Sequence, residues 1–166
     1  MEMTRVMDSE AFRRPDKIIV YLYRRTNPSG VEYLLLQRTP AGRSGSIWQT
    51  VVGNARWNEK LIEAACREVF EETGLTRLQG IMAIGYAFSF DFDLPRDTSS
   101  YAPDVRQICN TVLAAEVVST KPVTLSPEHI DYGWFLYQDA LERVHWSEEK
   151  EALVRLQPML GKFDLK

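Results

Sequence analysis

The segment between Gly53 and Leu75 constrains the fold of this chain more than any other stretch. Apolar side chains recur in it at helical spacing, which predicts a helix over residues 59–73. Asn58 can cap the start of this helix, and Gly74 can cap its end. The apolar face comprises Leu61, Ile62, Ala65 and Val69, and it can include Cys66. A helix with one apolar face must pack that face against another layer.

Strand patterns dominate the rest of the chain. Stretches rich in β-branched, leucine and aromatic residues predict strands at residues 17–23, 32–38, 47–52, 81–92, 108–118 and 130–137. The first two strands flank a dense cluster of turn formers at residues 26–30, which predicts a hairpin.

A second helix is predicted near the carboxyl end. Ser147 is a candidate N-cap, because acids follow it and leucines then recur at helical spacing at Leu153, Leu156 and Leu160. We therefore expect an α+β or α/β sandwich with a mixed sheet between helices. At 166 residues and 45% hydrophobic content, the chain fits one domain over residues 1–166.

Residues 93–104 form a polar stretch between two predicted strands. Pro95 and Pro103 interrupt it, which indicates an exposed loop. The stretch is long enough to cover a binding site, although a plain connection is the alternative.

Charge and composition exclude several classes of function. The net charge of -3 arises from 20 basic and 23 acidic residues without a cationic block, so nucleic-acid binding is not expected. No run approaches the roughly 18 apolar residues of a membrane span, and the amino terminus lacks a signal peptide. We expect a cytoplasmic protein without a membrane partner. Cys66 and Cys109 are too few for a disulfide framework and predict reduced, buried thiols.

Three acids gather at the end of the first predicted helix. Glu68, Glu71 and Glu72 share a face where like charges and the helix dipole each cost a few tenths of a kcal/mol or more. Arg67 can form an ion pair with Glu63 or Glu71, but one cation neutralises only part of this negative charge. A hard divalent cation such as Mg²⁺ prefers carboxylate oxygens and would neutralise the cluster. An ordinary solvated acidic face is the alternative.

The spacing of these residues resembles the signature motif of the Nudix hydrolases. The matching positions are Gly53, Glu59, Arg67, Glu68, Val69, Glu71, Glu72, Gly74 and Leu75. The resemblance implies an α+β fold, an α/β/α sandwich with a mixed sheet and a catalytic loop-helix-loop. It also implies Mg²⁺, or Mn²⁺, bound by Glu68, Glu71 and Glu72. Arg67 would orient carboxylates, and Gly53 would let the backbone approach the metal.

Two positions within this segment depart from what many members of the family carry. Asn58 stands where glycine is frequent, and it can adopt left-handed geometry or cap the helix. Arg56 stands where an acid is frequent, and it would add a cation near the phosphates. The second departure leaves the usual substrate open.

Looser matches are similar to one branch, the bacterial dihydroneopterin triphosphate pyrophosphatases, which also act as dATP pyrophosphohydrolases. They lie at residues 13–15, 35–38, 48–51, 101–103, 126–129 and 145–147. This likeness implies that Glu128 is a further metal ligand and that Arg13, Arg38 and His145 contact substrate. A loop cap for Glu128 and a surface ion pair for Arg38 are the alternatives.

Other chemistries have weaker support in the sequence. His129 and His145 are the only histidines and lack the spacing of a zinc site. No glycine-serine-glycine elbow or histidine-flanked cysteine indicates a covalent nucleophile. The four tryptophans fit a core or pocket wall, although one of them or Tyr101 could stack on a pterin or purine ring.

The expected function is therefore Mg²⁺-dependent hydrolysis of a small nucleoside-triphosphate-like substrate, dihydroneopterin triphosphate or dATP, to a monophosphate and pyrophosphate. Glu71 is the first candidate for the general base. Oxidised nucleotides, dinucleoside polyphosphates and ADP-ribose are alternative substrates, and a non-catalytic nucleotide-binding module is the alternative function. The sequence leaves the oligomeric state open.

Overall fold

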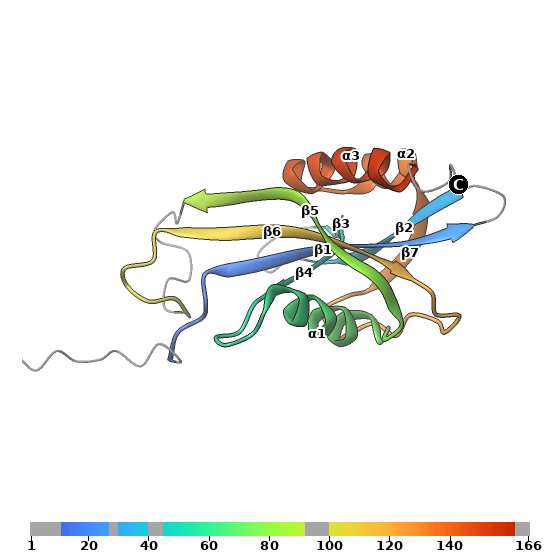
Figure 1. The fold of residues 1–166 in the computed structure, drawn as a ribbon. Helices are drawn as coiled ribbons and strands as arrows, with labels where there is room; N and C mark the ends of the chain where they lie inside the picture. The colour runs from blue at the N-terminus through green and yellow to red at the C-terminus, as the bar shows by residue number, and fades with distance from the viewer. Residues whose placement is uncertain (1–10, 27–29, 40–44, 92–99, 162–166) are drawn as a thin grey trace, which may run out of the picture.

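A mixed sheet lies between helices in the computed structural model, which describes residues 11–26, 30–39, 45–91 and 100–161. The described strands are β1 (Asp16–Thr26), β2 (Gly30–Arg38), β3 (Ile47–Gln49), β4 (Val51–Asn54), β5 (Leu78–Asp91), β6 (Gln107–Val117) and β7 (Asp131–Leu136). The described helices are α1 (Leu61–Thr73), α2 (Tyr137–Arg143) and α3 (Ser147–Gly161). Figure 1 shows α1 on one side of the sheet, with α2 and α3 on the other, so the predicted sandwich is confirmed.

The strands run in the order β3-β2-β1-β6-β5, while β4 also pairs with β1 and β7 with β2. β1 pairs antiparallel with β2 and β4 but parallel with β6. The sheet is therefore mixed, as predicted. β1 and β2 meet in register up to Thr26 opposite Gly30, which confirms the predicted hairpin. The middle of its turn lies outside the described residues.

β1 is central because both of its faces are buried. Ile18, Val20 and Leu22 pack in the core on the α1 side, and Ile19 and Tyr21 pack in the core on the α3 side. A strand covered on both faces has a continuous apolar run rather than an alternating pattern. Lys17, at the start of that run, is the point where β1 leaves the core and reaches the site described below.

The single strand predicted over residues 47–52 is wrong, because the structure has two strands separated at Thr50. Thr50 leaves the ladder: its backbone N–H donates to Glu149 Oε2 at 3.0 Å, and its hydroxyl donates to the carbonyl of Val20 at 2.5 Å. The break lets the chain change partners, since β3 pairs with β2 and β4 with β1.

The helix boundaries also differ from the prediction. α1 begins at Leu61, and the Glu63 carboxylate accepts the backbone N–H of Lys60 at 2.8 Å. Asn58 is therefore not the cap and instead takes the left-handed conformation, with φ of 67°. Gly74 ends α1 as predicted, with φ of 69°. Ser147 is the first residue of α3 rather than its cap, and the seven-residue α2 was not foreseen.

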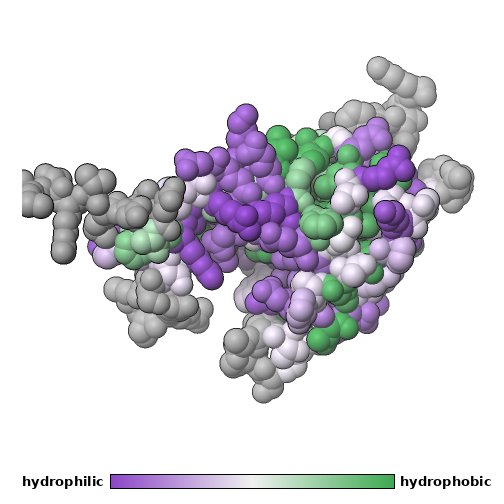
Figure 2. All heavy atoms as spheres, turned by 90° about the horizontal axis from the view of Figure 1, so that it is seen from below, coloured by the Kyte–Doolittle hydropathy of each residue, from purple (hydrophilic) through white to green (hydrophobic). Residues whose placement is uncertain are grey.

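The predicted burial of the cysteines is wrong, since Cys66 and Cys109 are both exposed, but both are free thiols as predicted. Cys66 lies on the outer face of α1 with Ile62 and Phe70, which are 51% and 56% exposed, so the apolar face of this helix is narrower than its sequence indicates. Figure 2 shows the side of the molecule that carries α1, where hydrophilic and apolar areas lie next to each other.

No described helix has both the length and the apolar character that crossing a bilayer requires. Most of the predicted loop over residues 93–104, namely residues 93–99, lies outside the described residues. Its end is tied to the chain ahead of β1, since the backbone N–H of Arg13 donates to the carbonyl of Ser100 at 2.7 Å.

Candidate active site

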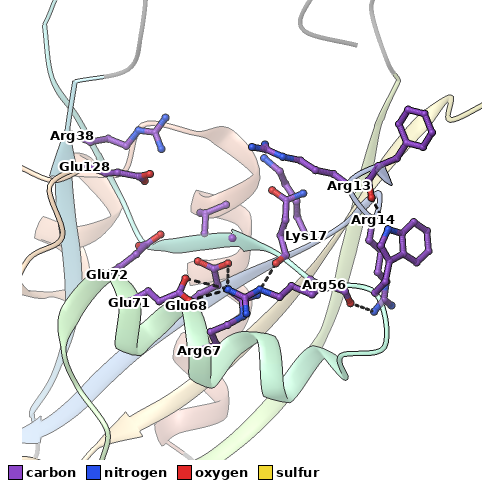
Figure 3. Close-up of a pocket in the computed structure, with 16 residues that line it drawn as sticks. Arg13, Arg14, Lys17, Arg38, Arg56, Arg67, Glu68, Glu71, Glu72 and Glu128 are labelled. Carbon is purple, nitrogen blue, oxygen red and sulfur yellow. Dashed lines mark hydrogen bonds and ion pairs between the residues drawn. The ribbon is translucent and has the colours of Figure 1, made fainter. Parts of the chain in front are cut away.

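The acidic end of α1 lines an open cavity of about 700 Å³. The walls come from the chain ahead of β1, the end of β2, the β4–α1 loop, α1 and the segment before β7. Ten charged residues line it: Arg13, Arg14, Lys17, Arg38, Arg56, Arg67, Glu68, Glu71, Glu72 and Glu128. Figure 3 shows the three glutamates of α1 on its floor, with Arg38 and Glu128 at one end and Arg13 and Lys17 at the other.

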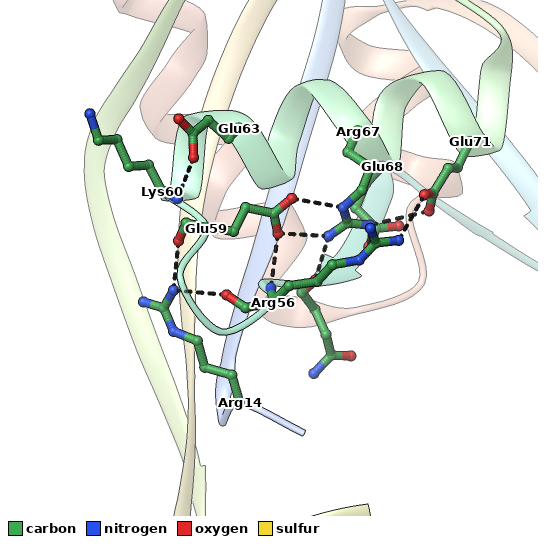
Figure 4. A network of polar contacts seen from close by, with 9 residues as sticks. Arg14, Arg56, Glu59, Lys60, Glu63, Arg67, Glu68 and Glu71 are labelled. Atoms are coloured by element: carbon green, nitrogen blue, oxygen red, sulfur yellow. Dashed lines mark hydrogen bonds and ion pairs between the residues drawn. The ribbon is translucent and has the colours of Figure 1, made fainter. Parts of the chain in front are cut away.

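Arg67 organises the acids around the floor of this cavity (Figure 4). Its guanidinium grips both carboxylate oxygens of Glu59, at 2.8 and 2.9 Å, and donates to the carbonyl of Asn54 at 2.9 Å. It also donates to Glu68 Oε1 at 2.6 Å and to Glu71 Oε2 at 3.1 Å. One planar side chain thus joins the β4–α1 loop to two of the predicted metal-binding glutamates. The role of Arg67 in orienting carboxylates stays a prediction.

The contact between Arg67 and Glu59 fixes the charge state of the pair. Hydrogen bonds from Arg67 lower the pKa of Glu59 to about 2, and the backbone N–H of Arg56 acts in the same direction. Glu68 behaves differently, because burial raises its pKa against the opposing effect of Arg67. Glu59 is therefore firmly ionised, whereas burial disfavours the charged form of the neighbouring Glu68.

Gly53 is required here for space. A Cβ atom at this position would overlap the carboxyl group of Glu68. The predicted role of Gly53, a close approach of the backbone to the metal, stays a prediction; the structure adds that the missing side chain leaves room for Glu68 against β4.

Gly53→Ala should lower hydrolytic activity by displacing Glu68, at a cost of about 1 to 3 kcal/mol in the free energy of unfolding from overpacking. Chemical denaturation and initial rates would measure the two effects. In a Glu68→Ala background the overlap is removed, so the same glycine substitution should cost little stability. An equal stability loss in both backgrounds would contradict this explanation.

Glu72 is the most deeply buried acid of the cluster, with 6% of its surface exposed. Its Oε2 atom has no hydrogen-bond partner among the described residues, and His129 Nε2 lies 3.8 Å away. Burial, followed by the nearby charges of Glu68 and Glu128, raises the pKa of Glu72 to about 8. A buried carboxylate oxygen without a donor, among other acids, is the environment that a bound cation would stabilise.

The residue types of the site fit a hard divalent cation. All four candidate ligands, Glu68, Glu71, Glu72 and Glu128, line the same cavity and offer carboxylate oxygens. Within the described ranges, no three or more His, Cys, Asp or Glu side chains already converge as a formed ligand set. Arg67 donates hydrogen bonds to Glu68 and Glu71, whereas Glu72 Oε2 has no donor among the described residues.

The structure brings most of the predicted substrate contacts to this cavity but not all of them. Arg13 and Arg38 line it, together with Glu128. His145 is not among its lining residues: its backbone N–H donates to the carbonyl of Trp48, and its ring stacks edge-on against Trp146.

Sequence reasoning missed Lys17 and Arg14, which also line the cavity. Burial, then the charges of Arg13 and Arg38, lower the pKa of Lys17, so the three cations lie close enough to repel one another. A lysine placed just before the apolar run of β1 was the signal that could have identified it.

A second cavity, of about 790 Å³, continues from the first. Arg13, Lys17, Arg38 and Val52 line both cavities. The second cavity has more aromatic lining residues, Phe88, Phe90, Tyr101 and Trp146, than the first, which has Phe12 and Trp57. Gln49, Asn110 and Glu149 add polar groups. The site thus has a charged compartment joined to an aromatic one.

Comparison with known proteins agrees with this architecture. The model of the NUDIX domain matches residues 13–156, so the chain belongs to the NUDIX family. The chain thus has the fold and the motif of this family. No curated protein matches the sequence.

Solved structures share the fold at low sequence identity. A Listeria monocytogenes structure assigned to the NUDIX hydrolases is 24% identical with a TM-score of 0.74, covering 92% of this chain and 99% of that one. The Escherichia coli dihydroneopterin triphosphate pyrophosphohydrolase is 22% identical with a TM-score of 0.67, covering 86% and 94%. A Caenorhabditis elegans Ap4A hydrolase is 21% identical with a TM-score of 0.67, covering 89% and 98%.

Proposed function

We propose that this chain hydrolyses a nucleoside-triphosphate-like substrate, dihydroneopterin triphosphate or dATP, to a monophosphate and pyrophosphate. The observation that carries the proposal is the pairing of two compartments in one site. The charged cavity holds acids and cations suited to a metal–polyphosphate complex, and the adjoining aromatic cavity is large enough for a bicyclic ring. Arg13, Lys17 and Arg38 stand where the two compartments meet, as a phosphate between ring and anhydride would require.

Glu68, Glu72 and Glu128 would hold the divalent cation, Mg²⁺ or Mn²⁺, with Glu71 as a further ligand. Such a cation neutralises phosphate charge and lowers the pKa of a coordinated water. Gly53 supports the placement of Glu68, because only a residue without a side chain leaves room for that carboxyl group.

Glu71 is the proposed general base. Its carboxylate is more exposed than that of Glu68 or Glu72 and can reach water in the cavity, while Arg67 and Arg56 hold it at 3.1 and 3.2 Å. It would accept the proton of the attacking water, and the arginines would stabilise negative charge on the phosphates. The rate acceleration would come from positioning the reacting groups and neutralising charge, without a covalent intermediate.

The E. coli relative is by name a dihydroneopterin triphosphate pyrophosphohydrolase, which supports the choice of substrate. The C. elegans relative is named an Ap4A hydrolase, which keeps a dinucleoside polyphosphate as the second candidate. Oxidised nucleotides and ADP-ribose remain further candidates. Arg56 adds a cation to the cavity, where it pairs with the half-exposed Glu71 and would contact the phosphates of any of these substrates.

The test is a substrate screen with Mg²⁺ and with Mn²⁺. Dihydroneopterin triphosphate, dATP, 8-oxo-dGTP, Ap4A and ADP-ribose would be compared by kcat/KM, and pyrophosphate would be distinguished from orthophosphate. We expect the first two substrates to react fastest and to release pyrophosphate. Release of orthophosphate alone, or turnover of Ap4A alone, would overturn the proposal, and tight nucleotide binding without turnover under either metal would favour a binding module.

A further inference from the structure

Glu149 is a buried acid that the proposed hydrolysis does not use. It lies in the first turn of α3, is only 3% exposed and lines the aromatic cavity. No described lysine, arginine or histidine forms an ion pair with it. An apolar residue of similar size would pack in this environment at lower cost, because burying a carboxyl group removes it from water.

Two hydrogen bonds hold Glu149 in a defined position. The hydroxyl of Tyr21, on β1, donates to its backbone carbonyl at 2.8 Å. The backbone N–H of Thr50, at the break between β3 and β4, donates to its Oε2 at 3.0 Å. The second carboxyl oxygen, Oε1, has no partner among the described residues and is left for a ligand in the cavity.

The surroundings of Glu149 favour its neutral form. Burial raises the pKa of this carboxyl group to about 8, against the opposing effects of the Thr50 hydrogen bond and of Arg38 on β2. Glu148 on α3 acts in the same direction as burial. Among the described residues, the remaining ionisable groups that line the cavity are Asp91 on β5, Tyr101, and Arg13 and Lys17 at the junction. Tyr21 on β1 contacts Glu149 through its hydroxyl.

A neutral carboxyl group has one good acceptor and one donor. Its carbonyl oxygen is the better acceptor, so the Thr50 N–H selects Oε2 for that role and leaves the proton on Oε1. The group therefore offers a donor to the cavity, beside the ring faces of Phe88, Tyr101 and Trp146.

We propose that Glu149 recognises the ring of the substrate, by donating a hydrogen bond from its carboxyl group to an acceptor atom of a heteroaromatic ring held in the aromatic cavity. The acceptor is a ring nitrogen or a ring carbonyl oxygen, chemistry that purines and pterins share. The inference rests on the proposed function, since it takes the ring-bearing half of the substrate to occupy this cavity. Ionisation of Glu149 replaces the donor with a negative charge and weakens binding of that ring.

The experiment compares a ligand that has a ring with one that lacks it. Isothermal titration calorimetry with Mg²⁺ would give the Kd of an α,β-methylene analogue of dATP and of inorganic tripolyphosphate between pH 6.5 and pH 9.5. The ratio of the two affinities isolates the ring, because phosphate titration affects both ligands. For the wild type we expect this ratio to fall by about 5- to 10-fold over the range, the size of one hydrogen bond.

Glu149→Gln should abolish this pH dependence, because the amide keeps a donor and an acceptor that do not titrate. Its ratio should stay within about threefold of the wild-type value at pH 6.5. Glu148→Gln, the matched charge change one residue away, should follow the wild type. A merely structural role, in which Glu149 only satisfies the Thr50 N–H, would leave the ratio unaffected by pH in every variant.

The outcomes separate this inference from the function on which it rests. A wild-type affinity ratio that does not change with pH, or a pH dependence that persists in Glu149→Gln, overturns the role of Glu149. If tripolyphosphate still binds in that case, the proposed phosphate site is retained. Failure of both ligands to bind overturns the inference together with the proposed function. A flat wild-type profile overturns the role of Glu149 even where a variant folds poorly.

Discussion

Glu72→Gln is expected to lower kcat/KM by about 10³-fold, near the upper limit of what one electrostatic group contributes to catalysis. Glutamine has nearly the shape of glutamate but cannot carry the charge that holds a cation. The variant should therefore fold normally, as circular dichroism would check, while steady-state kinetics with Mg²⁺ record the loss. Glu63→Gln is the matched control, because Glu63 lies on the same helix, caps Lys60 and does not line the cavity.

The same Glu72→Gln variant, which loses activity, should gain stability against unfolding in the metal-free protein at high pH. The pKa of Glu72 is about 8 in the folded chain and about 4.5 in the unfolded chain, so the folded state binds more protons between these values. Wild-type stability should therefore fall as the pH rises from about 4.5 towards 8, and the variant should lack this component. Mg²⁺ should restore wild-type stability at pH 8. A variant that loses as much stability as the wild type over this range would contradict the assignment.

Arg67→Lys should be the most disruptive single change outside the carboxylates. Lysine is a point charge and cannot reproduce the fork that spans Glu59, Glu68 and the Asn54 carbonyl. We expect a loss of about 3 kcal/mol in the free energy of unfolding, the lower end for breaking a buried pair, since Arg67 and Glu59 keep 17% and 14% exposure. Activity should fall at least about 10²-fold, because two acids lose their orientation.

The pH dependence of this loss identifies its source. Arg67 lowers the pKa of Glu59 from 4.5 to about 2, so this stabilisation is fully present above pH 4.5 and disappears as the pH falls through about 2. Denaturation curves of wild type and variant should converge over that window. Arg155→Lys is the control, since its exposed pair with Glu151 is worth about 0.5 kcal/mol or less. A stability difference that is constant down to pH 2 would exclude the Glu59 contact as its cause.

Local patterns were sufficient to predict elements whose environment is uniform. The buried run of β1, the amphipathic α1 and its Gly74 terminus each follow from residues within one turn or one strand of each other. One boundary failed because a distant group intervened. Thr50 splits the predicted strand because Glu149, 99 positions away, takes its N–H. The cap predicted at Asn58 is wrong because Lys60, two residues further along, is the N-cap of α1, and its backbone N–H donates to Glu63.

The sequence by itself determined the family, the sandwich fold and the identity of the acids that gather at the end of α1, because these depend on residue type and on spacing along one helix. Only the tertiary structure decided how those acids differ. It buried Glu72, left Glu71 exposed, placed Lys17 beside Arg13 and Arg38, and excluded His145 from the cavity. Burial and long-range contact set these properties, and both depend on elements far apart in the chain.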